Sequence, residues 1–332
     1  MFVAPSRRHA VTLAQNNPPM PQKIYTFGET VYDIIFKDSV PLTGKAGGSM
    51  LNTSVSLGRL GLDVCFVTDM GQDSIGDTII SFLVENGVNT SNIERYPNHK
   101  TAIAIAFLNE KNDASYTFYK DFPETRLNSL NLDFKEGDIV LFGSFFAIAQ
   151  SLRPVIRKFI SYAKEKGCII IYDPNFRKPH LHDLKKLEPF ILENIAFSDI
   201  VRGSDEDFKM IFGAKSPMDA FDIVMDNGCG NLIYTANRDD IIMMTRENTI
   251  TASVPYIETV STIGAGDNFN AGLIWTLCHE LVGKRDMDNL SVNIMEKIIA
   301  NGTTFAAEVC MSYDNYISAS FASRLKRKKT AK

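Results

Sequence analysis

The segment that spans residues 260–272, VSTIGAGDNFNAG, combines a glycine-rich turn with a carboxylate at the start of a helical pattern. In such a turn the small residues let several backbone N–H groups point at one spot beside the positive end of a helix. That spot suits an anion such as a phosphate. A carboxylate next to a bound polyphosphate suits a general base that takes a proton from an attacking hydroxyl. The segment therefore predicts phosphoryl transfer to an alcohol, with Asp267 as the base and Gly264, Ala265 and Gly266 around the anion.

Two other glycine motifs and one structural interpretation compete for this segment. A Walker phosphate-binding loop needs Gly-x4-Gly-Lys-Ser/Thr, which occurs nowhere in the chain. A dinucleotide-binding fingerprint needs a third glycine where Phe269 stands, and it opens a βαβ unit, whereas this segment lies near the C-terminus. Taken alone, the segment also fits a simple glycine turn in which Asp267 only favours the helix dipole.

A second glycine-containing segment, KAGGSMLN at residues 45–52, leads from a loop into a helix. Gly47 and Gly48 let a ligand approach the backbone, and the Asn52 amide can both donate to and accept from sugar hydroxyls. Asp33, just after the first predicted strand, is another candidate for hydroxyl binding. The alternatives are a helix cap in the loop and an exposed aspartate at the strand end.

The segment DPNFR at residues 173–177 follows an apolar strand pattern. Ligands of open parallel sheets bind beyond the carboxyl ends of the strands, where Asp173, Asn175 and Arg177 would lie. There they could organise a phosphate and its metal. The alternative is an Asp-Pro turn with a surface arginine.

A further polar segment, SDEDF at residues 204–208, follows another apolar strand pattern and opens a helix. Acidic residues in a first helical turn favour the helix dipole. Glu206 and Asp207 could also hold water around a Mg²⁺ ion that is bound mainly through nucleotide phosphates. Both interpretations stay open for this segment.

The composition of the chain excludes several classes of protein. The 332 residues are 45% hydrophobic and 22% charged, which is typical of one large α/β domain with an appendage or of two domains. A net charge of -4 argues against nucleic acid or an anionic membrane as the main partner. The five cysteines lack metal-ligand or redox spacing, which indicates a reducing cytoplasm, and no apolar run approaches the roughly 20 residues of a membrane span.

Short apolar runs that alternate with helical patterns predict a largely parallel sheet with helices on both faces. Six runs are predicted strands, at residues 23–27, 64–68, 139–142, 169–173, 200–202 and 232–235. Seven segments are predicted helices, at residues 51–60, 74–86, 152–166, 205–212, 217–226, 268–281 and 293–311.

Three parts of the chain fall outside this alternation. Residues 101–108 and 115–120 predict a β-hairpin that residues 32–36 could join, and such a sheet would suit a lid or a dimerisation surface. Residues 1–22 are expected to be a flexible leader. Residues 319–332 are expected to be a basic tail that is disordered or frays.

The order of the four motifs is more specific than any one of them. A Gly-Gly-x-x-x-Asn loop, Asp-Pro-Asn-x-Arg, an acidic helix start and Gly-Ala-Gly-Asp follow one another along the chain. In this, residues 23–318 resemble the PfkB (ribokinase-like) family of carbohydrate kinases. The resemblance implies a ribokinase-like three-layer α/β/α sandwich with a mostly parallel sheet and a small β lid, from about residues 32–43 and 96–121. It also implies ATP- and Mg²⁺-dependent phosphorylation of a sugar hydroxyl and a homodimer formed through the lid.

The resemblance assigns roles by position. Asp267 would be the catalytic base, and Gly264, Ala265 and Gly266 would form the anion hole. The sugar would be held by Asp33, Gly47, Gly48, Asn52 and, from the lid, Lys120. The nucleotide would meet Asn175, Arg177, Ser204, Thr235, Asn237 and Asn301, and the metal would meet Glu206 and Asp207. The chain looks like a fructokinase, with kinases of 2-keto-3-deoxygluconate or of nucleosides, or a weakly catalytic regulatory relative, as alternatives.

The chain departs from the family pattern at three places that bear on its cofactors. Relatives often carry Asn-x-x-Glu where this chain has Ser204-Asp-Glu-Asp207, which predicts different contacts to the nucleotide and the metal shell. Many relatives have Asp-Thr before the glycine turn where this chain has Ser261-Thr262, and that aspartate serves a monovalent-cation site. We therefore expect no dependence on potassium. Residues 235–239, TANRD, replace the Thr-x-Gly-x-x-Gly that lies beside the nucleotide in the family. This difference predicts altered contacts to ATP.

Overall fold

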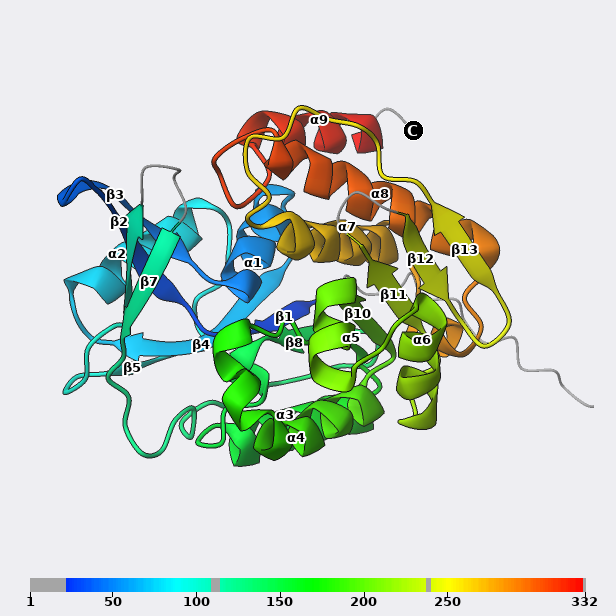
Figure 1. The fold of residues 1–332 in the computed structure, drawn as a ribbon, viewed down its shortest axis with the longest axis horizontal. Coiled ribbons are helices and arrows are strands. Elements are labelled where there is room, and N and C mark those ends of the chain that lie inside the picture. The colour runs from blue at the N-terminus through cyan, green and yellow to red at the C-terminus, as the bar shows by residue number, and fades with distance from the viewer. Residues whose placement is uncertain (1–21, 109–113, 237–239, 331–332) are drawn as a thin grey trace, which may run out of the picture.

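The computed structural model describes residues 22–108, 114–236 and 240–330. In this part of the chain nine strands form one sheet in the order β13-β12-β11-β10-β9-β8-β1-β4-β5 (Figure 1). Neighbours from β5 to β11 run parallel, and β12 and β13 are antiparallel. The strands are β1 (Ile24–Phe27), β4 (Val64–Gly71), β5 (Ile93–Tyr96), β8 (Ile139–Gly143), β9 (Ile169–Asp173), β10 (Ile200–Ser204), β11 (Leu232–Thr235), β12 (Ile241–Met244) and β13 (Thr249–Ala252).

The central strands are apolar along their whole length because helices cover both faces of the sheet. Alternate residues enter two separate cores, so that Ile24 of β1 packs on one face and Tyr25 on the other. The first core is closed by α1 (Ser49–Arg59), α2 (Ser74–Glu85), α7 (Ala265–His279), α8 (Val292–Cys310) and α9 (Ala319–Thr330). The second is closed by α3 (Arg153–Glu165), α4 (Leu184–Phe197), α5 (Asp205–Phe212) and α6 (Pro217–Asp226). The predicted three-layer sandwich is confirmed (Figure 1).

A second sheet of four strands, in the order β3-β2-β6-β7, stands beside the β4 and β5 end of the large sheet (Figure 1). Its strands are β2 (Val31–Lys37), β3 (Val40–Gly47), β6 (Ile103–Leu108) and β7 (Ala114–Tyr119). β6 and β7 pair antiparallel, as the sequence predicts, whereas β2 pairs parallel with β6. We call these four strands the lid. The connecting turn at residues 109–113 lies outside the described residues, as do residues 1–21 of the predicted leader.

The prediction of a disordered or fraying C-terminal tail is wrong, because helix α9 covers Ala319–Thr330. Phe321 and Ala322 are buried, and Leu325 packs partly against the first core. The Phe321 ring meets that of Phe305 on α8 edge to face, with centroids 5.3 Å apart. The many basic residues of this segment made its short apolar stripe hard to recognise in the sequence. Phe321, Ala322 and Leu325 form this stripe, which anchors the helix. Among the described helices none is both long and apolar enough to cross a bilayer.

We expect Phe321→Ala to lower the free energy of unfolding by about 3 kcal/mol, because it empties a filled site in the core. Chemical denaturation of the two proteins measures this difference. The exposed Ser323, two residues further along α9, provides the control, and Ser323→Ala should leave stability nearly unchanged. Equal stability of the Phe321 variant and the parent would mean that α9 is not docked in solution.

Candidate active site

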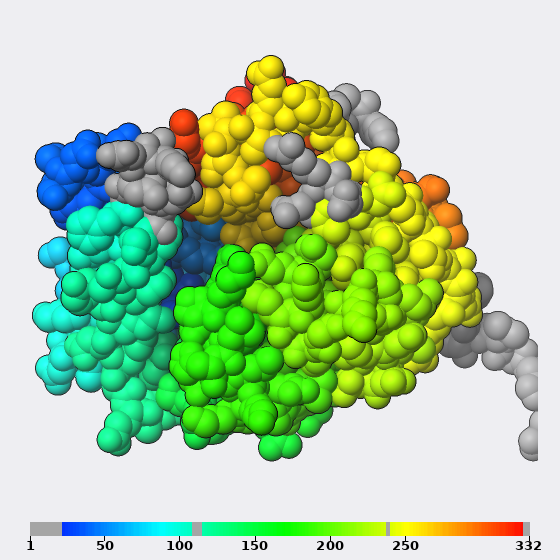
Figure 2. Space-filling view, viewed as in Figure 1, coloured from blue at the N-terminus to red at the C-terminus, as the bar shows by residue number. Residues whose placement is uncertain are grey.

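A cavity of about 640 Å³ opens between the lid and the large sheet. It lies at the carboxyl ends of the parallel strands, where open α/β sheets bind their ligands. Ser144 after β8, Asn175 after β9, Ser204 at the end of β10 and Thr235 at the end of β11 line it. Figure 2 shows the hollow between the cyan-green lid strands and the green helices. The polar segments that were predicted from the sequence to form binding sites therefore lie around one cavity.

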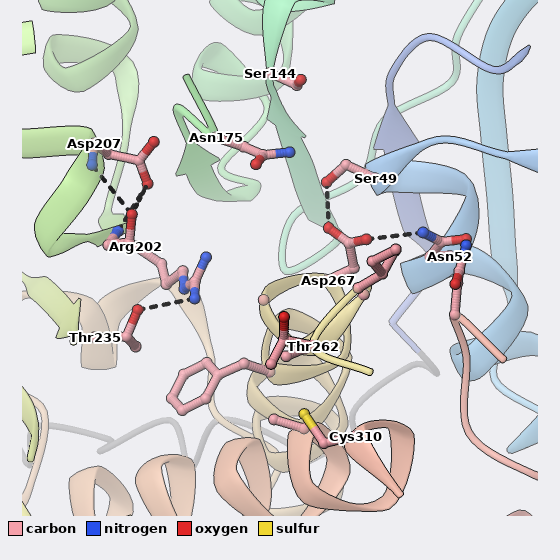
Figure 3. A pocket seen from close by; sticks show the side chains of 18 of the residues that line it. Ser49, Asn52, Ser144, Asn175, Arg202, Asp207, Thr235, Thr262, Asp267 and Cys310 are labelled. Carbon is pink, nitrogen blue, oxygen red and sulfur yellow. Dashed lines mark hydrogen bonds between the residues drawn. The ribbon is translucent and has the colours of Figure 1, made fainter. Parts of the chain in front are cut away.

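Asp267, in the first turn of α7, is fixed by side chains from α1 (Figure 3). Its Oδ1 accepts a hydrogen bond of 2.6 Å from the Ser49 hydroxyl, and its Oδ2 accepts one of 2.8 Å from the Asn52 amide. Burial raises the pKa of Asp267, while these two hydrogen bonds and the charges of Arg177 and Arg202 oppose the rise. The carboxylate is thus held in one orientation and made more basic than a surface aspartate.

The turn before Asp267 requires glycine at position 264 and leaves room for the Arg202 side chain at position 266. Gly264 has a φ of +83°, and a Cβ atom there would lie 2.6 Å from the Asn315 carbonyl oxygen. A Cβ atom on Gly266 would lie 2.8 Å from Nη1 of Arg202. No side chain in the described residues caps this end of α7. Backbone N–H groups of its first turn are therefore left for an anion in the cavity.

The predicted sugar-binding residues gather at the lid end of the cavity, with two exceptions. Asp33, Gly48 and Asn52 line it, and the buried Oδ1 of Asn52 has no hydrogen-bond partner in the described part of the chain. Gly47 is not in the lining, but its missing side chain makes room for Asp33, whose Oδ2 would lie 2.1 Å from a Cβ atom there. Lys120 also stays outside the lining, because its Nζ pairs with Glu29 at 2.7 Å.

At the other end, the predicted nucleotide residues divide into three groups. Asn175, Arg177, Ser204 and Thr235 line the cavity. Asn301 does not, because its amide donates to the Thr276 hydroxyl at 2.9 Å between α8 and α7. Asn237 lies outside the described residues.

The two predicted metal residues differ in what they are free to do. Both oxygens of Asp207 accept hydrogen bonds, Oδ1 from the Phe176 N–H at 2.7 Å and Oδ2 from the Ser204 N–H at 2.8 Å. This carboxylate therefore caps α5 and anchors the loop after β9. Glu206 lines the cavity with a side chain that is mostly exposed and pairs with Lys178 at 3.1 Å. Within the described residues no cluster of three acidic, histidine or cysteine side chains could hold a metal by itself.

One polar residue of the site escaped the sequence analysis. Arg202, near the end of β10, lines the cavity, and its Nη1 pairs with Asp173 at 3.1 Å. Its Nη2 donates to the Thr235 hydroxyl at 2.9 Å. Asp173 also accepts a hydrogen bond of 2.6 Å from the Asn270 amide. The signal for Arg202 was a charged residue at the carboxyl end of an apolar strand, which is the position that ligands face.

Known proteins share both the sequence pattern and this fold. Residues 21–317 match the domain described as "pfkB family carbohydrate kinase". The chain belongs to this family. A fructokinase of Rhizobium leguminosarum bv. trifolii is 27% identical to this kinase over 284 residues, which are 83% of this chain and 85% of the relative. A probable fructokinase of Arabidopsis thaliana, fructokinase-6, is 26% identical over 291 residues, 82% of this chain and 74% of the relative.

Among solved structures, aminoimidazole riboside kinase from Salmonella enterica, complexed with aminoimidazole riboside and an ATP analog, has the same fold as this kinase. The TM-score is 0.79 at 20% identity, and the match covers 92% of this chain and 99% of the other. The comparisons confirm the predicted family, the ribokinase-like fold and the class of enzyme, a sugar kinase. The roles of single residues stay predictions.

We expect the KM of this kinase for its sugar to rise as the pH falls through 6. Burial raises the pKa of Asp33 to about 6, with Lys45 opposing the rise, and only the charged form can accept hydroxyl protons on both oxygens. Below pH 6 the carboxyl is mostly neutral, so KM at pH 5 should be about tenfold that at pH 7. Steady-state kinetics across this range measure the effect.

The control for this pH dependence is Asp33→Asn, which cannot titrate. Its KM should be higher than that of the parent at pH 7 and nearly constant between pH 5 and pH 7. A parent KM that does not change over this range would remove Asp33 from the sugar site.

Proposed function

We propose that this kinase transfers the γ-phosphoryl group of ATP to a sugar hydroxyl, with Asp267 as the general base. The observation that carries the proposal is the position of one fixed, partly desolvated carboxylate at the uncapped start of α7. A base and an anion site then lie in the same first turn of α7 and face one cavity. This arrangement suits an attack by a hydroxyl on a phosphoryl group.

In the proposed reaction the sugar lies at the lid end, with one hydroxyl against Asp267. The hydroxyl oxygen forms a bond to the γ-phosphorus while the bond from that phosphorus to the bridging oxygen of ADP breaks. The proton of the hydroxyl passes to Asp267. Ser49 and Asn52 hold the carboxylate in place, and the N–H groups of the first turn of α7 stabilise the negative charge of the phosphoryl group.

We assign the opposite end of the cavity to the nucleotide. Its wall there is mainly apolar and suits the flat face of a base. Small and apolar residues from the 253–263 loop and from α8 form this wall: Val254, Pro255, Ile257, Ala306 and Ala307. The polar residues Asn175, Arg177, Ser204 and Thr235 lie nearer the sheet, where the phosphates would pass. The structural relative from Salmonella enterica was solved with an ATP analog, which supports ATP as the donor.

For the divalent cation we propose Mg²⁺, held mainly by phosphate oxygens. Such an ion needs only one or two carboxylates from the protein. Glu206 fits this role because it lines the cavity with an exposed side chain, whereas Asp207 is committed to the cap of α5. When bound, the ion would neutralise charge on the phosphates. We propose no requirement for a monovalent cation, because Ser261 offers no carboxylate and its hydroxyl accepts the Ile263 N–H at 3.2 Å.

The substrate we propose is a neutral ketohexose of the fructose type, since the sequence relatives compared above are fructokinases. We also propose that the protein works in the cytoplasm as a homodimer. The lid exposes the apolar side chains of Val40, Leu42 and Phe107, which a second copy could cover. Light scattering should then give twice the protomer mass of 37.0 kDa.

We expect Asp267→Asn to lower kcat by about 10²- to 10⁴-fold while sugar binding persists, because the amide keeps the shape of the carboxylate but cannot accept the proton. The measurement is ADP release from ATP and Mg²⁺ over a panel of neutral sugars, keto-sugar acids and nucleosides. Parallel assays in potassium and in tetramethylammonium salts test the cation proposal and should agree within about twofold.

Asp222→Asn, on the exposed side of α6, is the matched control and should keep the activity of the parent. Undiminished turnover by the Asp267 variant would exclude it as the base. If the parent binds a sugar but releases no ADP with any member of the panel, the regulatory alternative replaces the kinase.

A further inference from the structure

Arg202 is a buried cation in the wall of the cavity. Arg202 is 9% exposed and lies near the end of β10, a strand in the middle of the large sheet. A charged side chain that is buried to this extent normally either has ion-pair or hydrogen-bond partners or serves a function. Figure 3 shows its guanidinium between Thr235 and Asp267, on the side of the pocket that faces the start of α7.

The observed partners of Arg202 do not use up its donors. A guanidinium has five N–H groups in a planar fork. Nη1 meets Asp173 and Nη2 meets Thr235, while the buried Nε has no partner in the described residues. Asp173 in turn divides its oxygens between Arg202, Asn270 and the Asn175 N–H. The fork is therefore fixed in place and still has N–H groups to offer.

The guanidinium also touches the anion-binding turn. A Cβ atom on Gly266 would lie 2.8 Å from Nη1, 3.1 Å from Nη2 and 3.3 Å from Cζ of Arg202. The cation thus occupies the space that a side chain at position 266 would need. Any anion that the first turn of α7 binds through its N–H groups is consequently a neighbour of this guanidinium.

We infer that Arg202 is a catalytic residue that binds the phosphoryl group during its transfer and stabilises the charge that develops on it. The inference rests on the proposed kinase function. A planar guanidinium matches the oxygens of a phosphoryl group and cannot lose its proton. Arg202 thereby complements the N–H groups of the turn from a second direction. Asp173 is a positioning residue, because it holds the fork without lining the cavity, whereas Thr235 both holds the fork and lines the cavity.

The competing explanation is a structural ion pair between β9 and β10. The chain offers a matched case of such a role in Arg153, on α3, whose residue is 6% exposed. Arg153 pairs with Glu193 and donates to the Ala147 carbonyl at 2.9 Å, and its Nε is likewise buried without a partner in the described residues. It does not line the cavity. Burial and an unpartnered Nε are thus common to both arginines. What distinguishes Arg202 is its position in the cavity wall beside Gly266.

The test compares Arg202→Met and Arg202→Lys with Arg153→Met. Arg202→Met should lower kcat by about 10²- to 10³-fold with the KM for the sugar changed less than about threefold, and Arg202→Lys should recover part of the loss. Arg153→Met should lower the melting temperature without this selective loss of kcat. Because Arg202→Met leaves Asp173 as a lone buried charge, the double variant Asp173→Asn/Arg202→Met is measured alongside as a neutral version of the site.

A second readout separates transition-state binding from folding. Aluminium fluoride with ADP mimics a phosphoryl group in transfer, so it should tighten the binding of ADP and sugar to the parent and to Arg153→Met, but not to Arg202→Met. Free guanidinium ions should restore part of the kcat of Arg202→Ala and none of that of Arg153→Ala.

The outcomes are distinct. Unchanged kcat in Arg202→Met, or losses of activity that follow the melting temperature alike in both arginine variants, would overturn the inference. Tightening by aluminium fluoride that survives in Arg202→Met would overturn it as well. If the parent releases no ADP with any sugar, the proposed function fails first, and the aluminium fluoride titration still reports whether Arg202 binds the phosphoryl mimic.

Discussion

The polar contact between α1 and α7 is the constraint on which the site depends. Helix α1 is buried, yet it carries hydroxyl and amide groups where a core helix would carry apolar ones. Besides the two bonds to the Asp267 carboxylate, the Thr53 hydroxyl donates to the Asp267 carbonyl at 2.8 Å, and the Ser56 hydroxyl bonds to the Asn268 amide at 2.5 Å. Each group would be costly to bury alone, so the two helices fit in one register only. That register fixes the position of the Asp267 carboxylate.

From this register the rest of the cavity follows. The start of α7 lies beside the end of β10, which brings Gly266 against Arg202, and the pairing of β3 with β2 in the lid brings Gly47 against Asp33. A side chain at either glycine position would have to displace the charged group that faces it. In each of the two glycine motifs, the missing side chain leaves room for a charged side chain from a neighbouring strand. Asp267, the uncapped start of α7 and Asp33 therefore line one cavity with little freedom between them.

The local patterns in the sequence predicted most of the sheet, because buried parallel strands are short apolar runs and the helices between them have a strong period. Some of the missed elements had weak signals. Helix α4 contains Pro189, and β13 is an exposed edge strand of four residues. Within the site, the order of the motifs identified Asp267 as the candidate base. Spacing along the chain could not show that Asp207 caps a helix or that the Asn301 amide donates to the Thr276 hydroxyl. Such assignments depend on contacts between distant segments, as the role of Arg202 does.

The strand order has a consequence for how the chain is made. From β8 onward each new strand adds beside the previous one, so half of the sheet can grow as the polypeptide leaves the ribosome. The second face receives α3 to α6 along the way, whereas the first face waits for α7, α8 and α9 at the end of the chain. A nascent chain that has emerged as far as residue 260 therefore exposes apolar surface on the strands that α8 later covers, around Ile241 and Met243. The helices that follow residue 260 therefore both complete the cavity around Asp267 and cover an apolar surface that chaperones would recognise.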